Sequence, residues 1–219
     1  MTTVHHHPTE ETLIAFTSST LDEGNSLVVA AHLAHCEECR QAVRELTEIG
    51  GSLLEQAGAV AVAVSARRDC MSKLDNASRT ELAPAAERIS NDRTATLLSV
   101  YMGQPYASGK WRWLGPGVYQ QNIDIPNETG TRVFLLKAAP GTRLPDHEHI
   151  GTEWTCVLKG AFIHDGGRFG PGDFDEADGS VDHNPQVEDG EECICLVAMN
   201  GRIAMKSWLG RIIQPLVRF

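Results

Sequence analysis

Apolar residues recur at helical spacing in the first third of the chain, from Pro8 to about Asn76. Thr9 is followed by an acidic first turn and then by an apolar face, which is typical of a helix N-terminus. A second run of helical spacing follows Asn25 and Ser26, and either side chain is suited to cap a helix. We therefore expect two short helices in this part of the chain.

A third and a fourth helix are expected from about Glu37 onward. Apolar residues again recur every three or four positions in the third helix. They are Val43, Leu46, Ile49, Leu53 and Leu54. The pair Gly50-Gly51 falls inside this run and is expected to interrupt and bend the helix. The fourth predicted helix carries Val64, Met71 and Leu74.

The pattern changes after the polar stretch 77–93, which is rich in Ala, Glu and Arg and is predicted to be a linker. Thr94–Met102 predicts a short helix. From Gly109 onward, short apolar runs are separated by Gly, Pro, Asn and Asp, which is typical of an antiparallel barrel or sandwich. Examples are Val133–Leu136, Trp154–Leu158 and Cys193–Ala198. The chain therefore divides into an all-α unit at 1–76, a linker at 77–93 and an all-β unit at 94–219.

Composition and charge narrow the function classes. The 219 residues are enough for two domains, and the formal net charge of −10 argues against direct binding to DNA phosphates. A protein partner with a basic surface fits better. Apolar stretches such as Ala57–Val64 are far shorter than the roughly twenty residues of a membrane helix. Six cysteines without a secretory signal favour a reducing compartment, and we expect a cytoplasmic protein.

The first chemical constellation is the sequence His-Leu-Ala-His-Cys-Glu-Glu-Cys at 32–39. On a helix, residues three or four apart share a face, so His32, Cys36 and Cys39 can converge. Two thiolates and one imidazole are three of the four ligands of a structural zinc site. The fourth is available from His5, His6 or His7, and such a site would stabilise a small helical unit whose own core is limited.

Other interpretations of this constellation stay open on spacing alone. Cys36 and Cys39 form a Cys-x-x-Cys pair that also occurs in redox proteins, although no βαβ pattern surrounds it. They also fit two free cysteines on a helix beside unrelated histidines. The three N-terminal histidines also fit the remnant of an expression tag.

The second constellation spans Gly141 to Gly160 and fits the first cupin motif, G-x5-H-x-H-x3-E-x6-G, at every position. Residues two apart on a strand point to the same face, so His147, His149 and Glu153 can all point into a barrel. Two imidazoles and a carboxylate form a set of ligands for a divalent metal, and zinc, iron, manganese, nickel and copper all accept it.

A third histidine is expected from a later strand of the same barrel. His183 is the candidate, because it follows the turn Gly170–Asp173, which resembles the second cupin motif. The spacing from Gly172 to His183 is longer than in that motif. His164 is the competing candidate, but it precedes a Gly-Gly turn and is expected to face solvent. A metal-free barrel with polar residues at its mouth is the alternative.

Cys193 and Cys195 lie in an apolar run that predicts a strand, so both thiols are expected on one face. Their Cα atoms would be about 6.5–7 Å apart, near the upper limit for a disulfide. The pair fits two small core residues, and it also fits an oxidant-sensitive pair near the cupin metal.

The first constellation, between two helices and with a histidine near the chain start, resembles the zinc-binding anti-sigma domain. Combined with the cupin motif, the sequence resembles the ChrR-type anti-sigma factors over nearly its whole length. The resemblance implies that His32, Cys36 and Cys39 bind zinc, with His7 rather than His6 as the fourth ligand. It also implies a helical zinc-binding bundle followed by a cupin of double-stranded β-helix (jelly-roll) fold.

The resemblance further implies a function and a partner. The helical unit would sequester an extracytoplasmic-function sigma factor of group IV and block its access to RNA polymerase. The cupin would be the regulatory half, which releases the sigma factor in response to oxidative stress such as singlet oxygen. The rival hypothesis is a metal-dependent cupin enzyme, similar to dioxygenases or isomerases, with a helical interaction domain. It lacks a role for the zinc motif and an obvious general base.

Overall fold

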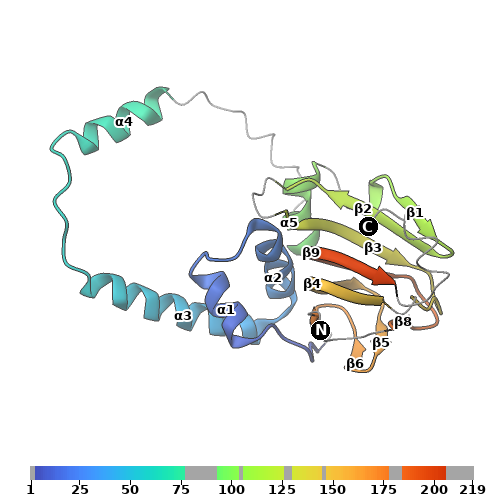
Figure 1. Cartoon of the computed structure of the whole chain (residues 1–219). Helices are drawn as coiled ribbons and strands as arrows, with labels where there is room; N and C mark the ends of the chain where they lie inside the picture. Colours follow the sequence, from blue (N-terminus) through green and yellow to red (C-terminus); the bar gives the residue numbers. More distant parts are fainter. Residues whose placement is uncertain are drawn as a thin grey trace.

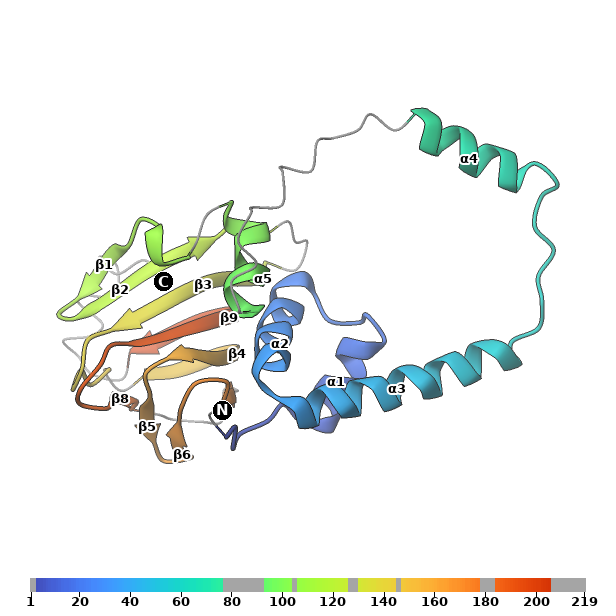
Figure 2. The same cartoon turned by 180° about the vertical axis from the view of Figure 1, so that it is seen from behind.

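The computed structural model describes residues 3–76, 93–103, 106–125, 130–144, 147–177 and 184–205. It consists of N-terminal helices followed by an antiparallel, cupin-like β unit (Figures 1 and 2). Nearly all of the predicted linker 77–93, the candidate ligand His183 and the stretch Trp208–Phe219 lie outside the described residues.

The first helices begin at capping side chains. The helices are α1 (Glu10–Thr17), α2 (Glu23–His35), α3 (Glu37–Gln56), α4 (Ala66–Asn76) and α5 (Arg93–Met102), followed by the 3-10 turn η1 (Tyr106–Ser108). The side chain of Thr9 accepts a hydrogen bond from the amide of Thr12, as its position predicts. Asp22, and not Asn25 or Ser26, caps α2 by accepting from the Asn25 amide, so α2 begins earlier than expected.

The predicted interruption of the third helix is wrong. α3 runs without a break from Glu37 to Gln56 and includes Gly50 and Gly51. Both glycines are exposed, and no neighbouring group approaches the position where a Cβ would lie. A glycine inside an exposed helix lowers helix stability by about 1 kcal/mol relative to alanine. This cost is small enough for a long helix to continue through the pair.

The β unit contains two antiparallel sheets. Its strands are β1 (Arg112–Gly115), β2 (Val118–Ile123), β3 (Arg132–Ala138), β4 (His147–Lys159), β5 (Phe162–His164), β6 (Gly167–Phe169), β7 (Phe174–Ala177), β8 (Gln186–Val187) and β9 (Cys193–Met205). The larger sheet has the order β1-β2-β3-β9-β4-β7, and the smaller has the order β6-β5-β8. This arrangement confirms the all-β, cupin-like class expected for the second half of the chain.

Both faces of the larger sheet are buried at β3 and β9, because the apolar residues of these strands alternate between two cores. Phe134, Cys195 and Met199 point toward the smaller sheet and join its Phe162 and Phe169. On the opposite face, Leu135, Leu196 and Ala198 pack with Leu27, Val28 and Val29 of α2 and with Leu98 of α5. The second core is therefore shared between the helical and β units.

Hydrogen bonds reinforce the packing of α1 and α2 on the sheet. The hydroxyl of Thr131 donates to Asp22 over 2.7 Å, and the hydroxyl of Thr12 donates to Glu176 over 2.6 Å. At Gly24, an added Cβ would lie only 2.7 Å from a methyl group of Val133. This close approach of helix to sheet explains why glycine occupies that position of α2.

The C-terminal part of α3 and the whole of α4 extend away from this shared core (Figures 1 and 2). Among the described helices, none combines the length and the apolar character needed to cross a membrane.

The shared core predicts that helices and sheet unfold together. Leu135 is fully buried (0% exposed) in β3 beneath α2, and we expect Leu135→Ala to lower the free energy of unfolding by about 2–5 kcal/mol. Urea unfolding is followed by helix circular dichroism and by tryptophan fluorescence, since every tryptophan lies after residue 110. Both midpoints should fall by the same amount. Exposed Ile163→Ala is the control, and a shift confined to fluorescence would contradict the shared core.

Candidate metal centre

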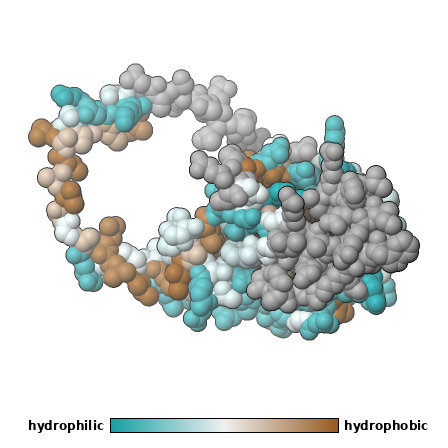
Figure 3. Space-filling view, viewed as in Figure 1, coloured by the Kyte–Doolittle hydropathy of each residue, from teal (hydrophilic) through white to brown (hydrophobic). Residues whose placement is uncertain are grey.

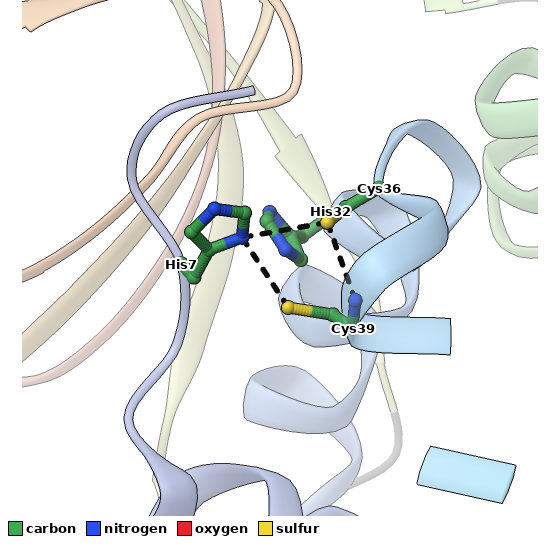
Figure 4. Close-up of side chains that lie close together, drawn as sticks. All are labelled: His7, His32, Cys36 and Cys39. Atoms are coloured by element: carbon green, nitrogen blue, oxygen red, sulfur yellow. Dashed lines mark hydrogen bonds between the residues drawn. The ribbon is translucent and has the colours of Figure 1, made fainter. Parts of the chain in front are cut away.

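Three neighbouring side chains and one from near the start of the chain converge at the junction of α2 and α3. His7, His32, Cys36 and Cys39 each present one ligand atom, and these atoms all lie within 4.8 Å of one another (Figure 4). His7 comes from the segment before α1, His32 from α2, and the cysteines from the start of α3. The structure thus brings together the three residues of the His-x3-Cys-x2-Cys motif with one N-terminal histidine.

The two cysteines are positioned by the first turn of α3. Cys36 is the N-cap of α3, and its Sγ accepts a hydrogen bond from the Cys39 amide at 3.3 Å. The positive end of the helix dipole favours a negatively charged ligand at this position. Burial, together with the neighbouring Cys36, raises the pKa of the Cys39 thiol to about 12. A metal ion that binds here must therefore displace the proton of a thiol that is neutral on its own.

His7 faces both thiols with one ring nitrogen. Its Nδ1 lies 3.4 Å from Sγ of Cys36 and 3.4 Å from Sγ of Cys39. In a tetrahedral zinc site with bonds of 2.0–2.3 Å, neighbouring ligand atoms are about 3.5 Å apart. Its other nitrogen, Nε2, faces the Glu38 carboxylate at 3.9 Å.

His32 is fully buried (0% exposed), and its tautomer follows from its contacts. Its Nδ1 lies 2.7 Å from the carbonyl oxygen of Gly172, which can only accept, so Nδ1 carries the proton and donates. Nε2 is buried and has no hydrogen-bond partner among the described residues. Burial lowers the pKa of His32 to about 4, so the ring is neutral at pH 7 and the lone pair of Nε2 is available to a metal.

The residues present fit a tetrahedral ion. Two sulphurs and two imidazole nitrogens are a soft and borderline donor set that suits zinc. The orphaned Nε2 of His32 gains a partner only if a ligand binds in the cluster, since a buried polar atom without a partner is costly.

The other histidines near this site have different roles. The ring of His6 stacks on Phe169 at 4.0 Å between centroids, and the amide of His5 donates to Asp173. Nε2 of His35 lies 2.9 Å from the hydroxyl of Thr94, which links α2 to α5. Of the three N-terminal histidines, His7 is therefore the one whose side chain lies in the cluster.

The candidate cupin site is described only in part. His147 and His149 begin β4, but their side chains lie outside the described part of the chain, as does the whole of His183. The pairing of β4 with β9 is regular from His147 to Val157, so positions 147, 149 and 153 keep the same register along the strand. Glu153 is the one predicted cupin ligand whose side chain the structure describes.

The carboxyl group of Glu153 is in a strongly perturbed environment. Burial, reinforced by the nearby Asp175 carboxylate, raises its pKa to about 7, while Arg132 acts in the opposite direction. Burial makes ionisation of this carboxyl group costly, and a cation bound beside it would make the ionised form favourable again.

His164 does not face solvent, and that prediction is wrong. Its side chain is only 5% exposed, and Nε2 lies 3.2 Å from an Asp175 oxygen. The ring stacks against Phe169 and Phe162. The Gly-Gly turn after His164 suggested a solvent-facing loop, but the aromatic residues of β5 and β6 cover the imidazole.

The cysteines of the β unit are buried. Cys193 and Cys195 point to the same face of β9, as predicted, with their sulphurs 3.6 Å apart. The hydrogen bond between Cys195 and Cys193, together with burial, raises the pKa of Cys195 well above its usual value, and burial also raises the pKa of Cys156. Cys156, Cys193 and Cys195 are therefore core residues. Cys70, on α4, is exposed.

Comparison with known proteins agrees with this architecture. The chain is 38% identical to the anti-sigma-E factor ChrR of Cereibacter sphaeroides over 216 residues, which cover 99% of each chain. Residues 104–202 match the family described as the ChrR cupin-like domain. The crystal structure of Rhodobacter sphaeroides SigE in complex with the anti-sigma ChrR is similar, with 37% identity and a TM-score of 0.75. The match covers 90% of this chain and 100% of that one.

The chain is thus a two-part protein, in which a helical unit with a His2Cys2 cluster shares one of the two hydrophobic cores with a cupin-like β unit. The similarity to a relative extends over the helices as well as the barrel. The chain belongs to the ChrR family.

Glu153 predicts a pH dependence of stability in the metal-free protein. Its folded pKa of about 7 exceeds the ordinary 4.5, so its favourable contribution is present below pH 4.5 and is lost as the pH rises through 7. The loss should amount to about 3 kcal/mol by pH 8. Glu153→Gln, which cannot ionise, should remove this part of the dependence.

The measurement is urea unfolding in excess chelator between pH 4.5 and 8. The exposed Glu191→Gln is the matched control and should follow the parent chain at every pH. Parallel curves for the parent and Glu153→Gln would show that Glu153 is not destabilised in its charged form.

Proposed function

We propose that this chain is an anti-sigma factor that sequesters an extracytoplasmic-function sigma factor of group IV. Membership of the ChrR family supports this function, and the related ChrR structure holds its SigE partner. The proposal places the binding function in the helical unit 1–76, joined by the linker 77–93 to a cupin domain at 94–219. The location that fits is the cytoplasm, where sigma factors act.

The observation that carries the proposal is a long apolar surface that the described structure leaves exposed. We call it the apolar arm and define it as the stretch from Ile49 to Leu74. Its exposed apolar residues are Ile49, Leu53, Leu54, Val60, Val62, Val64, Met71 and Leu74. They lie on the end of α3, the following segment and α4, where Figure 3 shows hydrophobic surface along most of the length.

An exposed apolar surface of this length is expected to bind a partner protein. Val60, for example, is 85% exposed. Burying one Val, Leu or Met side chain stabilises a complex by about 1.5–3 kcal/mol, and contiguous apolar surface of this extent is rare on a monomer without a binding role. The arm extends from the rest of the chain, so it can lie against a partner as large as a folded domain (Figure 1).

We propose that the ion in the His2Cys2 cluster is Zn2+ and that its role is structural. Bound zinc would join the segment before α1 to α2 and α3 through His7, His32, Cys36 and Cys39. It would thereby fix the direction in which α3 projects the apolar arm. Structural zinc contributes folding free energy directly, which a helical unit of this size needs.

We further propose that the cupin senses oxidative stress such as singlet oxygen and that the chain is a regulator rather than an enzyme. A second divalent ion (zinc, iron, manganese or nickel) would be held by His147, His149, Glu153 and His183. The raised pKa of Glu153 supports a cation there. Cys193 and Cys195 are the candidate oxidant-sensitive pair, which the 3.6 Å between their sulphurs supports.

The apolar arm predicts which substitutions abolish binding. In a pull-down from the native host, the full chain should retain a stoichiometric extracytoplasmic-function sigma factor, identified by mass spectrometry. With that sigma factor purified, Leu53→Asp and Val62→Asp should each weaken binding by about 30-fold or more, as at interface hot spots. Isothermal titration calorimetry measures the dissociation constant.

The control is Val100→Asp, which also places a charge on an exposed apolar position of a helix but lies on α5, outside the apolar arm. It should bind as the parent chain does. Equal binding by all variants would overturn the role of the apolar arm, and the absence of a sigma factor from the pull-down would overturn the proposed function.

The zinc proposal predicts distinct effects for two cysteines. Cys39→Ser should lower the zinc content by about one equivalent per chain, because it removes one of four ligands from a closed site. It should also lower the melting temperature and weaken sigma-factor binding. Cys70→Ser changes an exposed cysteine on α4 and should retain the full zinc content. Zinc is quantified by mass spectrometry of the purified, dialysed proteins, and equal contents would contradict the assignment.

A further inference from the structure

The turn between β6 and β7 contacts the segment that carries His7. The buried carboxylate of Asp173 (2% exposed) accepts two amide hydrogen bonds through Oδ1, from His5 at 2.6 Å and from His6 at 2.9 Å. Oδ2 accepts from the Gly170 amide at 2.7 Å, which fixes the carboxylate within its own turn. Three amides therefore hold one side chain of the β unit against the two residues that precede His7.

Backbone and ring contacts extend this attachment. The amide of Phe174 donates to the carbonyl of His6 at 3.1 Å, so the N-terminal segment continues the hydrogen bonding along the edge of β7. The ring of His6 stacks on Phe169, and its Nε2 lies 3.1 Å from the carbonyl oxygen of Arg168. The backbone next to His7 is thus fixed from the cupin side.

The same turn fixes His32. Gly172 accepts the Nδ1 proton through its carbonyl oxygen and thereby directs Nε2 into the cluster. Gly172 has a φ of +92°, and an added Cβ would lie 2.6 Å from the Cβ of His35 and 2.9 Å from Val4. The turn can approach the helix this closely because it has glycine at this position.

We propose that this turn of the cupin is a positioning element of the N-terminal metal centre, with Asp173 as the positioning residue for His7. The proposal rests on the proposed metal binding by the His2Cys2 cluster. The junction of α2 and α3 positions Cys36 and Cys39, whereas His32 and the residues next to His7 also contact the β unit. Groups that orient metal ligands from outside typically contribute 10–100-fold to metal affinity.

The test uses Co2+ as a probe of the metal-free full chain. Cobalt bound to thiolates shows a sulphur-to-cobalt charge-transfer band, which a site of histidines and carboxylates lacks. Cys39→Ser should remove most of this band and so assigns it to the N-terminal site. Competition with a chelator of known affinity then gives the cobalt affinity of this site alone.

We expect Asp173→Ala to weaken cobalt binding at the thiolate site by about 10–100-fold. Asp173→Asn retains an acceptor for the His5 and His6 amides and loses the one for Gly170, so it should be partly rescued, with a loss of about threefold to tenfold. Asp165→Ala changes an exposed position in the turn between β5 and β6 and should bind as the parent does.

The outcomes separate the two proposals. A parent chain without a thiolate–cobalt band would overturn metal binding and this inference together. A band of parental affinity in Asp173→Ala would overturn the positioning role alone. If Asp173→Ala does not fold, Asp173→Asn decides: parental affinity at an unchanged melting temperature overturns the role, and weakened binding at that temperature supports it.

Discussion

The packing of α2 on the outer face of the larger sheet determines the geometry of the N-terminal half. Leu27, Val28 and Val29 of α2 share a core with Leu135 and Leu196 of the sheet. This contact brings His32 within reach of Gly172 and leaves its Nε2 directed at the cysteines of α3. Without it, the helices would keep Cys36 and Cys39 together but would lose what orients both histidines. The metal cluster is thus a feature of the interface between the two units.

Local sequence patterns predict the structural features that depend on residues close together in the chain. The spacing of His32, Cys36 and Cys39 follows from helix periodicity, and the cap at Thr9 follows from its position before an acidic turn. The antiparallel all-β class follows from short apolar runs between turn residues, and the cupin type follows from the motif at Gly141–Gly160. Each of these predictions requires contacts across only a few residues or regular alternation along one strand.

The remaining features depend on contacts between distant segments, which spacing does not encode. In the sequence, Asp173 is recognisable only as part of a turn that resembles the second cupin motif. The neighbouring residues in the sequence do not indicate that its carboxylate accepts hydrogen bonds from the amides of His5 and His6. His164 was expected in solvent because its own turn is polar, yet Phe169 and Asp175 enclose it. The prediction for α3 failed for a local reason. The pair Gly50-Gly51 lowers helix propensity only slightly, and the helix continues through it.

The short strand β7 contacts both candidate metal sites. At its start, Asp173 and Phe174 hold the segment before His7, and one residue further along Asp175 lies beside Glu153 and His164. β7 pairs along β4 from Cys156 to Glu153, so it cannot shift on β4 without moving both ends. Energetic coupling requires that each site make different contacts in two arrangements of such an element, and it acts equally in both directions. Glu153 and the segment before His7 are therefore connected through contacts with the same short strand, β7.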